Sequence, residues 1–448
     1  MQGIVANANE IKQKIHDSAL LPVRQLLPDY QIEEWCRRCG LRWRKRFFTP
    51  VVSLLMCAWK HMDTCSARAM EDRLASMVPD WDHAHRDGRD FLNARARLSI
   101  RVFQHAVHHV SQCAQAAGAQ FWQGLRVAFV DGTTTSMPRT EKNVAAFGTS
   151  SNQHGPSHCP LLRILLISCA GTFFDVAFGP YTAAEARLWI ILLLRLPSNM
   201  LVIGDTTFCS YMALCLARQR GSHLIAPVHS GRRKDTRIET LGKNDELHRW
   251  SRPRSVHVLY PRVLATVPET IDVRIIHASI QRKGYRDYSI TLCTTLLDPR
   301  LHPIEDIVRL YLQRWNIEVD IRTLKTVHGL EHLTAKSPQI IIREMYSAIL
   351  AFNCSRALMA QSGAPVYSLS HQRCTTLLLD MACQMSQAST TMLPSLFRHL
   401  LRRMAEVKLD QNDRPPEPRV IVRNRRRFPY LTKISRSEWR KQNHAIPA

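Results

Sequence analysis

The chain has 448 residues, more than one hydrophobic core usually organises, so we expect two or three domains. Apolar residues make up 45% of it, which excludes a mainly disordered protein. Lys and Arg number 61 against 37 Asp and Glu, and the resulting net charge of +24 favours a polyanionic partner such as nucleic acid. A ribosomal, membrane-surface or merely basic protein is the alternative at this point.

Neither export nor membrane insertion is predicted. The first residues have no apolar stretch behind a basic start, so no secretory signal is expected. The longest apolar stretches, 161–179 and 188–204, are interrupted by charged residues such as Arg163 and Arg195 and are not expected to span a membrane. The 13 cysteines are scattered and odd in number, which favours a reducing cytoplasm. We therefore expect a cytoplasmic protein that, in a bacterium, is associated with the nucleoid.

Residues 1–120 are predicted to be helical, because apolar residues recur at helical spacing in VVSLLMCAWKHM and in LNARARLSIRVFQHAVHHVSQC. Arginines are crowded in and just before the second of these segments: Arg86, Arg89, Arg95, Arg97 and Arg101. A solvated basic face and a DNA-contacting face both fit this crowding.

The pattern changes to strands at Leu125. RVAFVD is a short apolar run that ends on Asp131, and MLVIGD is a second one that ends on Asp205. Between them, LLRILLISC and GTFFDVAFG are predicted to form a hairpin with its turn at Ala170-Gly171, followed by a helix in AAEARLWIILLLRL. This order of strands and helices predicts an α/β layer arrangement.

Residues 229–287 interrupt that order with a polar, basic stretch and strand-like runs, so an inserted β-rich subdomain is predicted. A long helix is then expected from Pro303 to Gly329, and a second one in SPQIIIREMYSAILAFNCSRALM. From Arg414 the chain is rich in Arg and Pro, which is typical of an extended basic tail suited to a phosphate backbone.

The expected long helix carries a polar face and an apolar one. Four polar residues at spacings of +3, +4 and +7 are predicted to share one face: Tyr311, Arg314, Glu318 and Lys325. Four apolar residues are predicted to pack on the sheet: Val308, Leu312, Trp315 and Val319. A surface ion pair between Arg314 and Glu318 is the alternative explanation of the polar face.

The two strand-end acids need compensation, because a carboxylate after an apolar strand costs desolvation free energy. Asp205 alone could simply cap the next helix. Together with Glu318, however, Asp131 and Asp205 make a predicted site for hard divalent cations, which prefer carboxylate oxygens. Two such ions roughly 4 Å apart activate an attacking hydroxyl and stabilise the leaving oxygen in displacement at phosphorus.

These residues resemble a known family. The DGT at Asp131, the apolar strand ending at Asp205 with Phe208 three residues on, and the pattern Y-x2-R-x3-E-x6-K are similar to the insertion-sequence-four (IS-four) transposases, which are DDE transposases. The segments RWNIEVDIRTLK, LTAKSPQIIIREMYSAIL and PRVIVRNRRRFPYL agree further, and RLASM and LNARARL resemble the family's helical DNA-binding region.

The resemblance implies an α/β fold in which an RNase-H-like catalytic core is interrupted by a β-rich insertion. The implied divisions are an N-terminal helical DNA-binding domain, a first core part, the insertion, a second core part and a basic C-terminal tail: 1–120, 121–228, 229–287, 288–405 and 406–448.

The resemblance also implies the site. Asp131, Asp205 and Glu318 would bind Mg²⁺ (or Mn²⁺), two ions per active site, and carry out catalysis. Five further residues would contact DNA: Tyr311, Arg314, Arg322, Lys325 and Trp250. Stacking on a flipped base is the implied role of Trp250, and packing in the insertion's own core is the alternative.

The implied function is that of a DNA transposase, which cleaves at transposon ends and transfers a strand into target DNA. Its partners would be the terminal inverted repeats, the target duplex and a second copy of the chain. One departure is Thr207, where the family usually has a small residue; a β-branched residue at positive φ would be strained. Another RNase-H-like nuclease, such as a resolvase, and an impaired or domesticated copy acting as a sequence-specific DNA-binding protein remain as alternatives.

Overall fold

The computed structural model describes residues 20–44, 48–76, 88–118, 121–152, 155–229, 236–253, 263, 265–280 and 288–409. Met1–Ser279 and Ser289–Leu409 form one compact unit, to which the description below applies. The expected strand VHVLY and the Arg- and Pro-rich tail lie outside the described residues.

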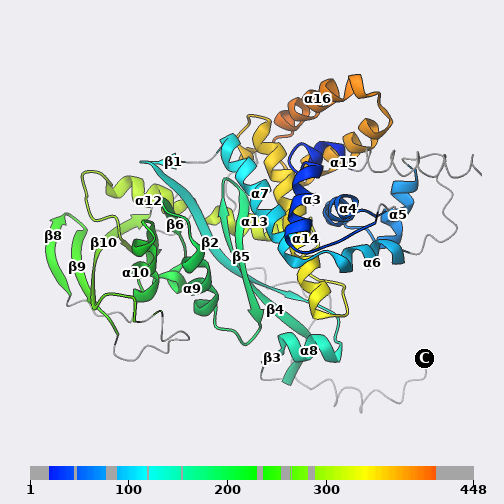
Figure 1. Cartoon of the computed structure of the whole chain (residues 1–448). Helices are drawn as coiled ribbons and strands as arrows, with labels where there is room; N and C mark the ends of the chain where they lie inside the picture. The colour runs from blue at the N-terminus through cyan, green and yellow to red at the C-terminus, as the bar shows by residue number, and fades with distance from the viewer. Residues whose placement is uncertain are drawn as a thin grey trace, which may run out of the picture. The chain divides into compact units, whose positions relative to one another are not determined.

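Before residue 119, all the regular secondary structure of the described residues is helical (Figure 1). They are α2 (Leu21–Arg24), α3 (Asp29–Arg38), α4 (Pro50–Met62), α5 (Ala67–Ser76), α6 (Arg89–Arg97) and α7 (Ile100–Gly118). Helix α4 begins after Thr49, whose hydroxyl accepts a hydrogen bond from the Val52 amide, and Pro50 suits its first turn. Nearly all of α4 is buried, since α3, α5 and α6 pack around it.

A single mixed sheet forms the centre of the unit. Its first strands are β1 (Phe121–Trp122), β2 (Leu125–Ser136), β3 (Thr149–Asn152), β4 (Gly155–Cys169), β5 (Thr172–Pro180), β6 (Met200–Ile203) and β7 (His223–Pro227). Strand β4 is antiparallel to both β5 and β2, whereas β2, β6 and β7 run parallel. The resulting order β5-β4-β2-β6-β7 confirms the predicted RNase-H-like α/β core. The hairpin turn is also confirmed, with positive φ at Ala170 (52°) and Gly171 (72°).

Helices cover both faces of this core. On one face, α9 (Glu185–Arg195) and α10 (Tyr211–Gln219) pack against alternate sheet residues such as Ala128 and Val130. On the other face, α7, α13 (Trp315–Thr326) and α14 (Pro338–Gln361) pack against Val127 and Phe129. Because the strands are buried on both faces, their sequences are continuous apolar runs rather than alternating ones.

The predicted β-rich insertion is present, and its strands continue the sheet. In the sheet, β11 (Tyr288–Thr294) pairs antiparallel with β7. Beyond β11 lie β10 (Thr270–Ile280), β9 (Asp245–Ser251) and β8 (Arg237–Gly242), in that order. A buried ion pair holds them in place: Arg274 donates to the Asp245 carboxylate from Nε (2.8 Å) and Nη2 (2.7 Å). The same guanidinium donates to the carbonyl of His302, just before α12 (Ile304–Leu312).

The expectation of one helix from 303 to 329 is wrong. Helices α12 and α13 are separate, with the break at Gln313 and Arg314. The predicted apolar stripe is also wrong, since Leu312 and Trp315 are 49% and 58% exposed. The buried apolar residues are different ones: Ile307, Leu310, Ile317, Ile321 and Leu324. The charged Asp320 lies among them and is itself buried, which hides the stripe in the sequence.

The remaining described elements are helical: α8 (Glu141–Phe147), α15 (His371–Gln387) and α16 (Leu393–Glu406). Within the described ranges, no helix is long and apolar enough to cross a membrane.

Candidate active site

Asp131 and Asp205 lie at matching positions of the neighbouring parallel strands β2 and β6. The last paired residues of these parallel strands are Phe129 and Ile203, and Asp131 and Asp205 each follow two residues later. The Asp131 carboxylate accepts a hydrogen bond from the Gly132 amide (2.8 Å). That of Asp205 accepts one from the Thr207 amide (2.8 Å), which caps the short 3₁₀ helix η1 (Thr206–Phe208). Asp205 therefore caps a helix and lies beside Asp131.

The third acid is brought to this edge by α13, which packs on β2. The segment that follows α13 is hydrogen-bonded to the end of β2: the Leu333 amide donates to the Ser136 carbonyl (2.9 Å), and the Thr135 hydroxyl donates to the Leu330 carbonyl. Glu318, in the first turn of α13, is paired with Arg314 at 2.7 Å. These bonds fix the helix that carries Glu318 over the strand that carries Asp131.

The three acids are close enough for their charges to act on one another. Burial is the main cause that raises the pKa of Asp131 from 3.8 to about 6, and the negative charges of Asp205 and Glu318 raise it further. The Arg314 guanidinium acts in the opposite direction. A cation would relieve this repulsion between carboxylates.

The donor set fits a hard divalent ion, since all three groups are carboxylates. Asp131 and Asp205 would hold it, with Glu318 as the third ligand. Among the described residues, no three acidic, imidazole or thiol groups are close enough together to bind one ion as arranged here, and Glu318 is turned toward Arg314. To bind a metal, Glu318 would therefore have to leave its ion pair with Arg314.

The predicted DNA contacts divide into two groups. Arg314, Arg322 and Lys325 lie on α13 or at its start, and Lys325 is 3.1 Å from Glu331. Tyr311 lies instead on α12 and is buried, next to Arg314, whose pKa it raises electrostatically. The prediction that all four residues of the Y-R-E-K pattern share one continuous helical face is therefore wrong.

Trp250 lies on β9 and is 3% exposed, packed in the core shared with α9 and α10. This arrangement favours the packing alternative over stacking on a base. An exposed tryptophan does exist at the site: Trp315, between Arg314 and Glu318 in sequence, projects into solvent. The sequence prediction missed it because it assigned Trp315 to the packed stripe.

The concern about Thr207 is not supported. Among the described residues, those with positive φ do not include Thr207. It lies in η1, where its amide is bound by Asp205, so a β-branched side chain fits without strain.

A fourth acid, Glu185, was not predicted as part of the site. It is the first residue of α9, on the opposite face of β2 from Asp131, and a Cβ at position 132 would overlap its Oε1. Burial raises the pKa of Glu185, Arg163 lowers it and Asp205 raises it. The atom that approaches Gly132 is the end of a flexible side chain, which can turn aside, and nothing in the sequence pointed to Glu185.

An RNase-H-like sheet that brings three carboxylates to one edge is typical of metal-dependent phosphoryl-transfer enzymes acting on nucleic acids. A family model described as "Transposase DDE domain" matches residues 122–354, more than half of the chain, and the three acids lie inside that range. The chain belongs to this family of DDE transposases, and the resemblance to the IS-four type is confirmed.

Two relatives illustrate the similarity. "Transposase InsG for insertion sequence element IS4" of Escherichia coli (strain K12) is 24% identical over 358 residues, which cover 77% of this chain and 79% of that protein. A solved structure of the piggyBac transposase synaptic complex with hairpin DNA matches with a TM-score of 0.43 and 13% identity, covering 89% of this chain and 87% of that one.

Proposed function

We propose that this chain is an active DNA transposase that uses Asp131, Asp205 and Glu318 to cleave at its element's ends and to join them to target DNA. The observation that carries the proposal is geometric: Asp131 and Asp205 lie at matching positions of the parallel strands β2 and β6, and α13, which carries Glu318, packs on β2. Its binding partners would be the terminal inverted repeats and the target duplex, with a homodimer placing one active site at each end. The five sequence divisions given above are proposed as its domains.

Two Mg²⁺ or Mn²⁺ ions, when bound, would supply the Lewis acidity that activates the attacking oxygen and stabilises the leaving one. In the first step, water attacks the scissile phosphorus and the P–O3′ bond breaks, leaving a 3′ hydroxyl. In the second step, that hydroxyl attacks a target phosphodiester and displaces its 3′ oxygen. The carboxylates of the chain would hold the ions and orient them between the two oxygens.

The cations on α13 would hold the phosphate backbone. Arg314 presents a planar guanidinium beside the acids, and such a group binds phosphate through two parallel hydrogen bonds. Once Glu318 binds a metal, Arg314 is released from its 2.7 Å ion pair and becomes free to donate to phosphate. Lys325 would exchange Glu331 for a phosphate in the same way, and Arg322, exposed on the same helix, would add a further contact.

The test is excision of a marker flanked by the DNA that surrounds the gene, followed by recovery of joined target. Glu318→Gln keeps the side chain's size and removes a metal ligand, so excision is expected to fall by at least about 1,000-fold, below detection, as when an essential charged group of a catalytic set is lost. Glu305→Gln, on the exposed first turn of α12, removes the same charge outside the site and should leave excision unchanged.

The same assay separates the alternatives. Binding of the end DNA without excision by the wild type would support a catalytically impaired DNA-binding protein. Metal-dependent cleavage without joining to target would support another RNase-H-like nuclease, such as a resolvase.

A further inference from the structure

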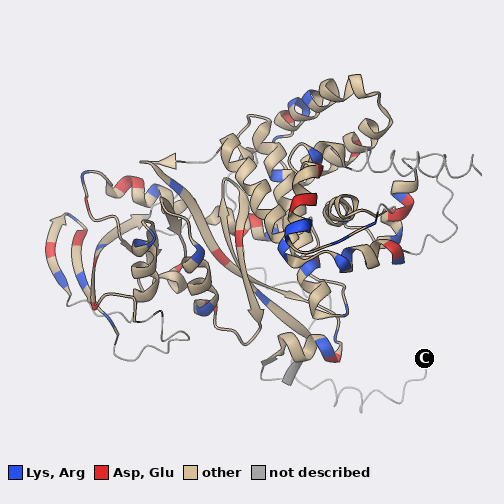
Figure 2. Ribbon diagram, in the orientation of Figure 1, with Lys and Arg blue, Asp and Glu red and all other residues tan. Residues whose placement is uncertain are grey.

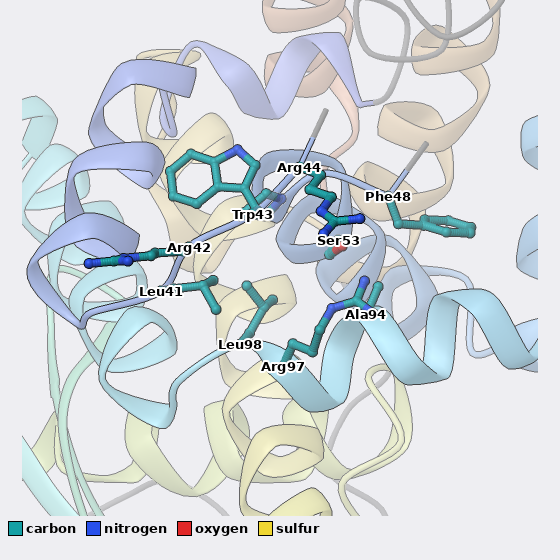
Figure 3. Close-up of a pocket in the computed structure, with 10 residues that line it drawn as sticks. Leu41, Arg42, Trp43, Arg44, Phe48, Ser53, Ala94, Arg97 and Leu98 are labelled. Carbon is teal, nitrogen blue, oxygen red and sulfur yellow. The ribbon is translucent and has the colours of Figure 1, made fainter. Parts of the chain in front are cut away.

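A second site lies far from the three acids in the fold, among the N-terminal helices. Residues 41–44, Phe48 with the start of α4, and the end of α6 line a pocket of about 170 Å³ (Figure 3). Its lining combines apolar side chains, two aromatic rings and three arginines: Leu41, Arg42, Trp43, Arg44, Phe48, Pro50, Ser53, Ala94, Arg97 and Leu98.

The arginines leave an unneutralised positive charge at this pocket. The guanidinium ends of Arg44 and Arg97 point toward one another across it, whereas Arg42 points away (Figure 3). All three are exposed, and within the described ranges none of them has an ion-pair or hydrogen-bond partner on its side chain. Two guanidinium groups that converge repel each other unless an anion lies between them. Phosphate suits such a pair, since it accepts hydrogen bonds from both. Basic residues recur along α6 and the chain before α4 (Figure 2).

The apolar part of the pocket is held in place by contacts outside it. The Arg37 guanidinium lies 5.9 Å from the centroid of the Trp43 ring and is itself paired with Glu33 at 2.7 Å. The Leu98 carbonyl accepts a hydrogen bond from Nε of Arg343 on α14 (2.7 Å), which ties the pocket floor to the helix packed on the catalytic sheet. The indole and the floor are therefore positioned before any ligand arrives.

The volume limits what can enter. A cavity of about 150 Å³ holds a benzene-sized ring. At about 170 Å³, this pocket accommodates one single-ring heterocycle and excludes a base pair. An aromatic wall beside a cationic rim is the arrangement by which proteins hold an unpaired base and its phosphate.

We infer that this pocket binds one unpaired pyrimidine nucleotide of DNA, with the base against Trp43 and its phosphate between Arg44 and Arg97. The inference rests on the proposed DNA transposase function and assigns part of the crowded arginines of α6 to a defined DNA contact. Of the other arginines in that segment, Arg95 is buried and Arg101 is exposed.

The experiment compares binding of the full chain to single-stranded oligo-dT, oligo-dA and a duplex of the same length, by fluorescence anisotropy. Trp43→Ala should weaken oligo-dT binding about 5- to 100-fold, the range for losing one base–aromatic stacking contact, with little change for the duplex. Tyr30→Ala removes an exposed aromatic outside the pocket and should change neither. Arg97→Gln should weaken oligo-dT binding more than Arg101→Gln, an equal charge loss at an exposed residue that does not line the pocket.

Location is tested by photo-crosslinking. A strand containing 5-iodouracil should crosslink to the peptide that contains Trp43. If Trp43→Ala does not fold, Trp43→Phe takes its place, and this variant should still bind oligo-dT because it keeps an aromatic ring. The assignment is overturned if the strand crosslinks to another peptide, or if the variants lose as much affinity for the duplex as for the single strand. It is also overturned if free thymidine monophosphate competes as strongly as the strand does. If the end duplex is bound and cleaved while these results fail, the pocket assignment alone is rejected. If the wild type binds no DNA, both proposals are rejected.

Discussion

Two carboxylates on α13, only two residues apart, have opposite environments. Glu318 is 31% exposed and has one ion-pair partner, Arg314, which is itself partly exposed. Asp320 is fully buried and accepts hydrogen bonds from Nη2 of Arg356 (2.6 Å) and from the Tyr367 hydroxyl (2.8 Å). One side of the helix therefore carries an acid that can change partners, and the other an acid that cannot.

The difference separates a functional charge from a structural one on the same element. A metal or a phosphate can displace a partner that solvent already reaches, because the exchange leaves no buried group unpaired. The same exchange at Asp320 would strand a charge in the core, which costs several kcal/mol. The Asp320 pair instead fixes α13 to α14, and so fixes the position from which Glu318 reaches the site.

The largest effect on stability is expected from breaking the buried pair. Arg356→Leu leaves the Asp320 carboxylate without its cation and should lower the free energy of unfolding at pH 8 by about 3–5 kcal/mol. Arg314→Leu removes the partner of the exposed acid and should lower it by about 1 kcal/mol or less. Urea unfolding of both variants measures the difference.

A pH series sharpens this result. Burial already raises the pKa of Asp320 to about 6, and the loss of Arg356 raises it further. The loss of stability in Arg356→Leu should therefore shrink as the pH falls towards 6, because Asp320 of the variant takes up its proton at a higher pH than Asp320 of the wild type, and should stay constant below about pH 6. Equal losses in the two variants, or a loss that does not depend on pH, would contradict the distinction between the two acids.

The sequence was sufficient to place the two strand acids on neighbouring strands, because RVAFVD and MLVIGD are buried apolar runs that each lead to an aspartate. It predicted only one of the two strand ends correctly: β6 ends at Ile203, whereas β2 continues beyond Asp131 to Ser136. It was insufficient for α13. Asp320 places a charge on the buried side of that helix, and the partners that make this tolerable, Arg356 and Tyr367, are distant in sequence. Periodicity alone therefore placed the apolar stripe on a side that is not buried.

The place of the insertion's strands in the sheet and the approach of Glu185 could not be predicted, for a related reason. Whether strands join an existing sheet depends on pairing with β7, which no local pattern encodes. Likewise, Glu185 enters the site through its approach to a glycine more than fifty residues earlier, Gly132. Both are consequences of packing between distant segments.

A smaller effect is expected on the other face of β2. Gly132→Ala introduces a Cβ that overlaps the Glu185 carboxylate, which is the end of a flexible side chain and can turn aside, so the free energy of unfolding should fall by about 1 kcal/mol or less. The double variant Gly132→Ala/Glu185→Ala restores the space, and a double-mutant cycle measures the coupling. Additive effects of the two changes would show that Glu185 does not occupy this space.

The smallest expected change in stability tests the repulsion among the three partly buried acids Asp131, Asp205 and Glu318. The pKa of Asp131 is raised to about 6 by burial first and by Asp205 and Glu318 next, so the folded chain binds this proton more tightly than the unfolded chain does. Ionisation of Asp131 therefore lowers stability: the loss is absent below about pH 4, grows between pH 4 and 6, and is complete above pH 6. Asp131→Asn should accordingly raise the free energy of unfolding of the metal-free protein at pH 8, by on the order of 1 kcal/mol after solvent screening, and leave it unchanged at pH 4.

Added Mg²⁺ should stabilise the wild type at pH 8 and the variant much less, because a ligand that binds only the folded state adds to its stability. A variant that is less stable than the wild type at pH 8 would show that the charge of Asp131 has a compensating partner, as that of Asp320 has in Arg356.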